Sequence, residues 1–186
     1  MTLGTEFDSV LVAAQSGADW AIAALYRDLN PRLLRYLRAQ APTVAEDLAS
    51  EVWMAAARQL PNFEGDEGAL RGWMFTIARR RVISHWRQTD RRRTNPVPNE
   101  ALNDHVSRED PENTVIGSMT AQEAVAALVA ELPPDQAEVV LLRVLGDLDV
   151  AQVAEITGKR PGTVRVLQHR ALRRLAVKLS REVVTG

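Results

Sequence analysis

The chain has 186 residues, 46% of them hydrophobic and 25% charged, and its formal net charge is −1. This length accommodates one domain or two small ones. The absence of cysteine excludes disulfides and cysteine-ligated zinc sites, and it fits a reducing compartment. No apolar run approaches the roughly 20 residues that a membrane span needs, and the N-terminus lacks the basic start and apolar core of a signal peptide. We therefore expect a cytoplasmic protein without membrane insertion.

The first 60 residues predict several helices from apolar residues at helical spacing. We expect a short helix over 6–15, two pieces over 20–29 and 31–39 that join at Asn30-Pro31, and a helix over 45–60. Thr43 and Glu46 form a T-x-x-E capping box at the start of the helix over 45–60.

Asp47 and Glu51 lie one turn apart on this last helix, on a different face from the apolar stripe and without a local basic partner. Two carboxylates at this spacing repel each other slightly. The face is either simply solvated or suited to a basic partner surface.

Residues 61–68, with the sequence PNFEGDEG, predict a loop, and a long helix is expected over 69–89. Residues 71–93 contain eight arginines and one acidic residue, for a net charge of +7. Trp73 falls in an apolar stripe and is assigned to the core. Trp86 lies among the arginines and fits either the core or a nucleic-acid surface, where rings stack on unpaired bases and guanidinium groups hold phosphates.

The next segment, 94–117, contains three prolines, four asparagines and five acidic residues, with little apolar periodicity. These features predict a flexible acidic linker. Further helices are expected from Ser118 or Met119 to Glu131 and over 135–145. Without any strand pattern, the sequence predicts an all-α fold. Two small helical domains, 1–93 and 119–186, are joined by the linker 94–118.

Residues 149–175 predict two short helices joined by a tight turn. Asp149 and Gln152 form a weak capping box for the first helix, and Gly158 ends it. Residues 159–181 contain eight basic residues and no acidic one. A short apolar helix, a turn and a basic amphipathic helix are typical of a helix-turn-helix that places its second helix in a DNA major groove. The alternative is a helical hairpin with a solvated basic face.

Four segments, taken together, resemble a bacterial RNA polymerase sigma factor of the extracytoplasmic-function type. They are AEDLASEVW, F-x-G-…-W-M-F-T-I-A-R, LPPDQAEVVLLR and GTVRVLQHRALRRL, and they follow in the family order over nearly the whole chain. The resemblance implies a protein that binds core RNA polymerase through its β and β′ subunits, recognises and melts promoter DNA, and starts transcription. It also implies restraint by an anti-sigma factor. No enzyme activity, cofactor or metal is expected.

The resemblance further implies three sets of contact residues. The helix with the two carboxylates would meet the coiled coil of the polymerase clamp through Asp47, Ser50, Glu51 and Met54. The loop from Phe63 to Gly68 would receive a flipped base of the −10 element, and the next helix would open and hold that element. The residues of this second set are Phe63, Arg79, Arg80, His85, Trp86, Arg87 and Arg91. The second helix of the helix-turn-helix would read the −35 element as duplex through Arg160, Thr163, Arg165, Val166, His169, Arg170 and Arg173.

Several residues depart from the family pattern. Ser50 replaces a frequent Gln, Arg80 a frequent Asn, and Ser84 a frequent Asp. Leu167 stands where many members have Arg, after Val166 in place of Ser. The −10 preference and the −35 base contacts of the common type therefore do not transfer to this chain.

Two other classes of protein remain as alternatives. A stand-alone helix-turn-helix regulator would bind duplex DNA by itself, and it would need neither the basic helix over 71–93 nor the Asp47 and Glu51 face. A nucleic-acid enzyme would need clustered carboxylates or histidines, whereas His85, His105 and His169 lie far apart in the sequence.

Overall fold

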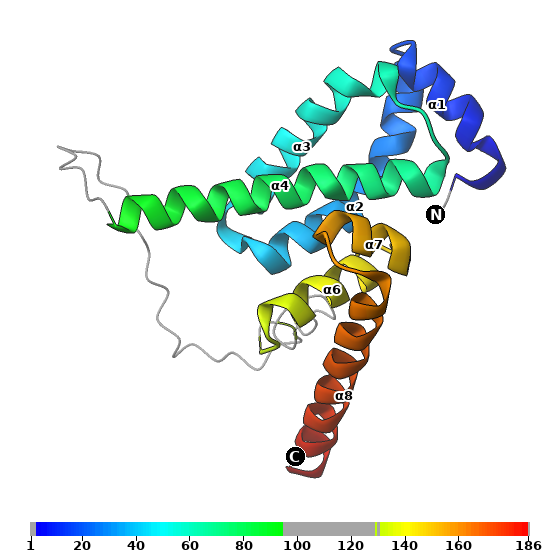
Figure 1. The fold of residues 1–186 in the computed structure, drawn as a ribbon. Coiled ribbons are helices and arrows are strands. Elements are labelled where there is room, and N and C mark those ends of the chain that lie inside the picture. The colour runs from blue at the N-terminus through cyan, green and yellow to red at the C-terminus, as the bar shows by residue number, and fades with distance from the viewer. Residues whose placement is uncertain (1–2, 95–128, 130, 186) are drawn as a thin grey trace.

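The described part of the chain is helical. The computed structural model describes residues 3–94, 129 and 131–185, and no strand occurs among them, which confirms the all-α fold. Two groups of helices follow one another along the chain, the first blue to green and the second yellow to red (Figure 1). In chain order the helices are α1 (Phe7–Gln15), α2 (Asp19–Gln40), α3 (Ala45–Gln59), α4 (Glu67–Thr94), α6 (Pro134–Val144), α7 (Val150–Thr157) and α8 (Pro161–Thr185).

Helices α1 to α4 surround an apolar core. The most buried large side chains of this group include Leu33, Tyr36, Val52 and Phe75. The rings of Tyr36 and Phe75 meet edge to face with their centroids 5.4 Å apart, and burial raises the pKa of the Tyr36 hydroxyl far above its usual value. Because each helix turns one apolar stripe inward, the opposite face of α3 is left to solvent.

Helix α2 passes through Pro31 without a break, so the predicted joint at Asn30-Pro31 is wrong. A proline inside a helix removes one backbone hydrogen bond. Here Leu29 and Leu33, on either side of it, are almost completely buried. In addition, Asn30 Oδ1 accepts a hydrogen bond of 3.0 Å from Trp53 Nε1 on α3. These tertiary contacts keep the helix continuous.

The capping box predicted from Thr43 and Glu46 is also wrong. Residues Pro42–Val44 form a 3-10 turn, and Val44 precedes α3 without a side-chain capping bond. Glu46 instead accepts hydrogen bonds from Arg38 Nε and Nη2 at 3.0 and 2.7 Å. The hydrogen bond from Arg38 lowers the pKa of the Glu46 carboxyl.

Helices α7 and α8 form the predicted helix-turn-helix. The capping box at the start of α7 is complete, because the Gln152 backbone N–H donates to Asp149 Oδ1 and the Asp149 backbone N–H donates to Gln152 Oε1, each at 2.8 Å. Gly158 ends α7 with a φ of +69°, as predicted. Helix α8 begins at the predicted proline but continues beyond the predicted end at Leu175.

Helix α4 runs to Thr94, the first residue of the predicted linker, and residues 95–118 and most of the helix predicted to end at Glu131 lie outside the described residues. The boundaries of the two domains, 1–93 and 119–186, therefore stay a prediction.

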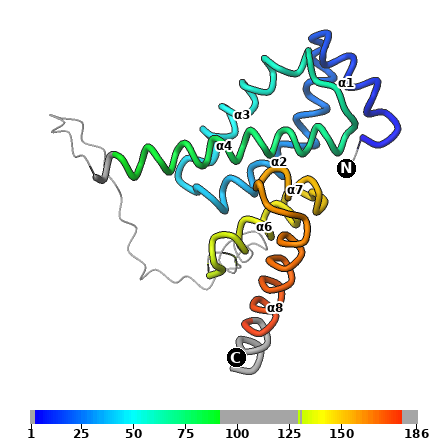
Figure 2. The backbone as a smooth tube through the Cα atoms, in the orientation of Figure 1, coloured from blue at the N-terminus to red at the C-terminus, as the bar shows by residue number. Residues whose placement is uncertain are grey.

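The two groups of helices pack against each other, with α7 against α4 and α6 against α2 (Figure 2). The chain packs tightly against α4 at Gly146, just after α6. A Cβ atom at this position would lie 2.6 Å from the Leu142 carbonyl oxygen and 3.2 Å from the ring of Phe75 on α4. The backbone would have to shift to accept any side chain here. The sequence, which predicted two domains on a flexible linker, gave no sign of this contact.

We expect Gly146→Ala to lower the free energy of unfolding by about 1–3 kcal/mol, because the added methyl group overpacks a closed site. The control is Gly162→Ala on α8, where nothing lies within 4 Å of the added Cβ. Alanine is the better helix former there by up to about 1 kcal/mol, so the control should be neutral or stabilising. Thermal and denaturant unfolding of both variants test this, and equal shifts would contradict the close packing at Gly146.

Candidate functional site

The outer face of α3 carries the first predicted set of contact residues. Asp47, Ser50, Glu51 and Met54 recur at i, i+3, i+4 and i+7, so they share one face of the helix. Met54 has 55% of its surface exposed, while Leu48 and the other apolar residues on the opposite side are buried. The structure thus brings the four predicted residues together as one exposed face with an apolar side chain beside two carboxylates.

This face has a local basic partner that the sequence did not predict. Arg81 on α4 places Nη1 3.5 Å from Glu51 Oε2, and the two side chains are 39% and 47% exposed. An exposed ion pair of this kind contributes about 0–1 kcal/mol. Glu51 can therefore exchange Arg81 for another cation at little cost, whereas Asp47 makes no ion pair that the structure records.

The loop before α4 has an ordered backbone, held by a turn, a capping hydrogen bond and a contact between two aromatic rings. It starts as a 3-10 turn, Leu60–Asn62, and Asp66 Oδ1 then accepts a hydrogen bond of 2.7 Å from the Ala69 backbone N–H near the start of α4. The ring of Phe63 packs on the ring of Trp73 with centroids 5.2 Å apart. Trp73 belongs to the half-buried residues that pack against the core, as predicted.

The basic face of α4 is exposed and hollowed. Arg80, Ser84, Arg87 and Arg91 follow one another at helical spacing and, with neighbouring residues, line a hollow of about 400 Å³. Trp86 is 44% exposed. That exposure decides between the two alternatives for Trp86, because a ring so open to solvent is not a core residue. His85 lies half-buried beside it.

Arg79 stands apart from the other arginines of α4. Its Nε and Nη2 donate to Glu138 Oε1 and Oε2 on α6 at 2.7 and 3.3 Å, and the side chains are only 25% and 17% exposed. The hydrogen bonds to Glu138 raise the pKa of Arg79. Arg79 is a predicted −10 contact, and a carboxylate from the second group of helices holds its guanidinium group.

A second charged contact joins the same two groups of helices at the turn after α6. Asp147 Oδ2 lies 2.8 Å from Arg32 Nη1 on α2 and 3.3 Å from Arg71 Nη1 on α4. Arg71 is buried and also pairs with Glu67 at 2.9 Å. Gln152 Nε2 on α7 adds a hydrogen bond of 2.7 Å to the Gly68 carbonyl oxygen.

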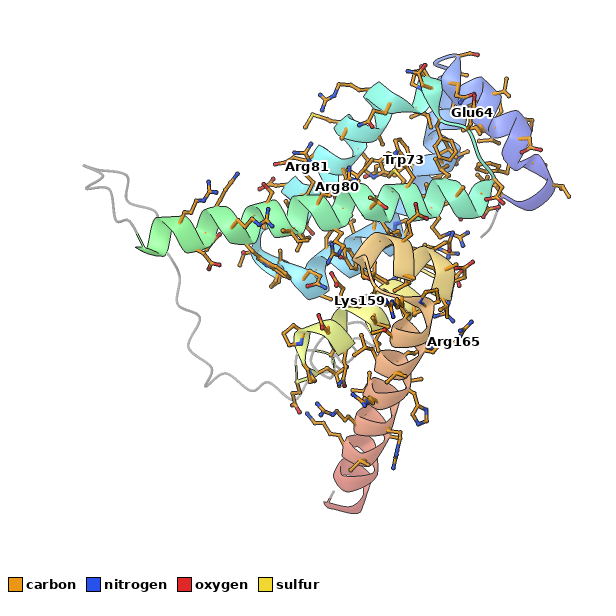
Figure 3. All side chains as sticks on the ribbon, viewed as in Figure 1. Glu64, Trp73, Arg80, Arg81, Lys159 and Arg165 are labelled. Atoms are coloured by element: carbon orange, nitrogen blue, oxygen red, sulfur yellow. The ribbon has the colours of Figure 1, made fainter. Side chains whose placement is uncertain are left out.

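The predicted contact residues of the helix-turn-helix are all exposed, whereas Val164 and Ala171 on the same helix are fully buried. Figure 3 shows Arg165 near the start of α8, on a different part of the molecule from Arg80 and Arg81. Leu167 is half-buried and packs against the core. The replacement of the frequent Arg by Leu167 therefore adds a core contact and removes a charge from the exposed face. The exposed residues are Arg160, Thr163, Arg165, Val166, His169, Arg170 and Arg173.

In the described ranges we find no group of three or more His, Asp or Glu residues that could hold a metal ion. Within the same ranges, no helix has the length and apolar character needed to cross a membrane.

Comparisons with known proteins agree with the family resemblance of the sequence. Family models described as Sigma-70 region 2 and Sigma-70 region 4 match residues 25–92 and 122–175. The ECF RNA polymerase sigma factor BldN of Streptomyces coelicolor is 34% identical over 165 residues, which cover 88% of this chain and 62% of BldN. The ECF RNA polymerase sigma factor SigD of Mycobacterium tuberculosis is 31% identical over 179 residues, covering 92% of this chain and 83% of SigD.

A solved structure has a similar fold. It is the sigma factor RpoE of Bartonella quintana in complex with the anti-sigma factor NepR, with a TM-score of 0.61 and 25% sequence identity. The match covers 84% of this chain and 97% of that one.

The contact between Arg79 and Glu138 predicts how the two groups of helices separate. We expect Glu138→Ala to raise about tenfold the fraction of molecules in which the two groups of helices have moved apart. The reason is that a half-buried arginine loses two charge-assisted hydrogen bonds. The chain has no cysteine, so spin labels on Val12→Cys and Val177→Cys, both at exposed positions, would report the distance between α1 and α8.

The matched control for this experiment is Asp135→Ala. Asp135 is also on α6, but it pairs with Lys159, 3.2 Å away, inside the second group of helices, and its charge is the weakest of those that raise the pKa of Arg79. An unchanged distance distribution for Glu138→Ala, or an equal shift for Asp135→Ala, would contradict the prediction.

Proposed function

Because the chain belongs to the extracytoplasmic-function family of bacterial RNA polymerase sigma factors, we propose that it binds core polymerase and directs promoter recognition, DNA melting and transcription initiation. One observation carries the proposal. The exposed face of α3 is acidic and apolar, whereas the exposed faces of α4 and α8 are basic, so one surface suits a basic protein partner and two suit nucleic acid. The first domain would be 1–93, the linker 94–118 and the second domain 119–186.

The α3 face is the proposed contact with the β and β′ subunits of core polymerase. In the family, carboxylates at the positions of Asp47 and Glu51 meet the coiled coil of the clamp. Met54 adds an exposed, flexible apolar side chain beside them, and such side chains adapt to a partner surface. Arg81 would then either stay beside Glu51 at the edge of the interface or give way to a cation from the coiled coil.

The loop and the basic face of α4 are the proposed site for the melted −10 element. Pulling a base out of the stack costs a few kcal/mol. Contacts in a pocket and stacking on aromatic side chains must offset this cost. The exposed ring of Trp86 can stack on an unpaired base, and Arg80 and Arg87 beside the hollow can hold phosphates. With Arg80 in place of the frequent Asn, a charge replaces a neutral base contact, which supports a −10 preference of its own for this chain.

The exposed face of α8 is the proposed reader of the −35 duplex. Phosphate contacts position the helix, and contacts with base edges specify the sequence. Arg165 is the best candidate for a base edge, since a bidentate contact with guanine provides about 1–3 kcal/mol of discrimination. Leu167 is left out of the proposed readers because it packs against the core.

Sigma factors act by binding, so we propose that this chain is not an enzyme, needs no cofactor and works in the cytoplasm with the polymerase. An anti-sigma factor is a proposed partner as well. The support for it is the fold shared with Bartonella quintana RpoE, which was solved in complex with the anti-sigma factor NepR.

The test of polymerase binding is Asp47→Arg combined with Glu51→Arg. The double variant should no longer comigrate with core polymerase in gel filtration, and it should keep its fold because neither carboxylate is buried. The control reverses Asp8 and Asp19, exposed carboxylates on α1 and α2, which changes the net charge equally. Unchanged comigration of the first variant would sink the assignment. A wild-type chain that never comigrates would point to a stand-alone helix-turn-helix regulator.

A second test separates the two nucleic-acid surfaces. Arg165→Ala should weaken binding to −35 duplex and relax the preference at one base pair by about 1–3 kcal/mol. Arg87→Ala on α4 should weaken binding evenly across sequences and reduce the salt slope. Fluorescence anisotropy over a range of salt, with promoters mapped by run-off transcription, measures both effects. The same even loss for both variants would show that α8 does not read bases.

A further inference from the structure

Gln15, the last residue of α1, ties this helix to the loop that precedes α4. Its Nε2 donates hydrogen bonds to the Leu60 carbonyl oxygen at 3.1 Å and to the Phe63 carbonyl oxygen at 2.7 Å. These carbonyls lie at the start of the 3-10 turn Leu60–Asn62 and just after it. A primary amide has two N–H donors, so both donors of Gln15 are used on one short segment of the loop.

The remainder of the loop is anchored independently. Asp66 caps the start of α4 through the Ala69 backbone N–H, and Glu67 accepts a hydrogen bond of 3.0 Å from the Gly4 backbone N–H. Gly65 has a φ of +148°, and a Cβ there would lie 2.8 Å from Ala69 Cβ and 3.1 Å from the Phe63 ring. The second half of the loop is therefore held by contacts that do not involve Gln15, whereas the first half depends on Gln15 and on the contact between Phe63 and Trp73.

We propose that Gln15 is a positioning residue for the selection of the flipped −10 base, an inference that rests on the proposed role of this loop. By holding the two carbonyls, Gln15 fixes the path of residues 60–63 before DNA arrives. A preformed pocket spends less binding energy on ordering its own chain, so more remains to discriminate between bases. Gln15 lies before residues 25–92, which match the Sigma-70 region 2 model.

Gln15 also lines a small apolar cavity of about 170 Å³ with Ala14, Leu60, Pro61 and neighbouring side chains. Its stem could therefore act by filling space, and the experiment must separate volume from hydrogen-bond donation. Gln15→Glu keeps the volume, but an ionised carboxylate cannot donate and would face two carbonyl oxygens. Gln15→Ala removes both the volume and the donors.

The experiment uses holoenzyme reconstituted from the full chain and core polymerase. The probe is a promoter fragment that is already open across the −10 element, with the non-template bases randomised, and bound fragments are sequenced. Gln15→Ala and Gln15→Glu should both reduce the preference at one −10 position about tenfold, which is the effect expected from losing two hydrogen bonds. Preferences at the other positions and binding to core polymerase should stay as in the wild type.

The matched control is Ser16→Ala, because Ser16 lies next to Gln15 and its Oγ donates to the Val12 carbonyl oxygen at 3.0 Å, away from the loop. This variant should leave the preference at every position unchanged. A general loss of stability would lower the bound fraction at all positions together without changing the preferences. Thermal unfolding of each variant identifies such a loss.

Two results would overturn the inference. The first is an unchanged preference profile for both Gln15 variants. The second is a wild-type profile for Gln15→Glu with a changed one for Gln15→Ala, which would show that Gln15 acts by volume. Phe63→Ala separates these from failure of the proposed function. If Phe63→Ala changes the profile while the Gln15 variants do not, the loop reads the base without Gln15. If it also leaves the profile unchanged, the loop does not read the −10 element.

Discussion

The burial of Arg71 constrains how the two groups of helices fit together. A buried guanidinium is costly unless carboxylates or other acceptors surround it. Arg71 is 9% exposed, and two carboxylates reach it, Glu67 from its own helix and Asp147 from the turn after α6. Asp147 adopts a left-handed backbone with a φ of +52°, which aspartate tolerates better than most residues, and Gly146 before it lets the turn approach Phe75. The turn thus combines a close apolar contact with a carboxylate directed at Arg71, and the position of α7 across α4 follows from this geometry.

This packing affects the proposed DNA surfaces unequally. The predicted residues on α8 are all exposed, so the duplex-reading face is open in this arrangement. On α4 the hollow beside Arg80 and Arg87 is open too, but Arg79 is occupied by Glu138. A phosphate and Glu138 compete for the same guanidinium, because each needs the same N–H donors. Full use of the α4 surface therefore requires α6 to move away from it, whereas the α8 surface requires no such change.

What the sequence predicted well was local. The capping box of Asp149 and Gln152 and the stop at Gly158 involve residues within one or two turns of each other, and the structure confirms them. The errors at Pro31 and Thr43 have the opposite origin. A continuous α2 depends on Trp53 of α3, and Glu46 is taken by Arg38 of α2. The contacts that define the candidate site share this difficulty. Arg79 and Glu138 are separated by 59 positions in the sequence, and no spacing rule pairs residues at such a distance. The family resemblance indicated the candidate residues, but it did not indicate which of them would be bound by another residue of the same chain.

The distribution of charge accounts for this occupation. Residues 71–93 have a net charge of +7, and the described residues among 119–158 belong to a block with a net charge of −6. The sequence was right to divide the chain into basic and acidic blocks, but it treated both basic blocks as surfaces for an external polyanion. In the structure, two acidic residues of the second block, Glu138 and Asp147, reach three arginines of the first group of helices. Salt screens exposed pairs more than buried ones. The contact of Asp147, which is 63% exposed, should therefore weaken with ionic strength before that of Glu138, which is 17% exposed. Of these two contacts, the one between Arg79 and Glu138 persists to higher ionic strength. Because Arg79 is a proposed −10 contact, promoter DNA competes with Glu138 for this arginine even at high salt.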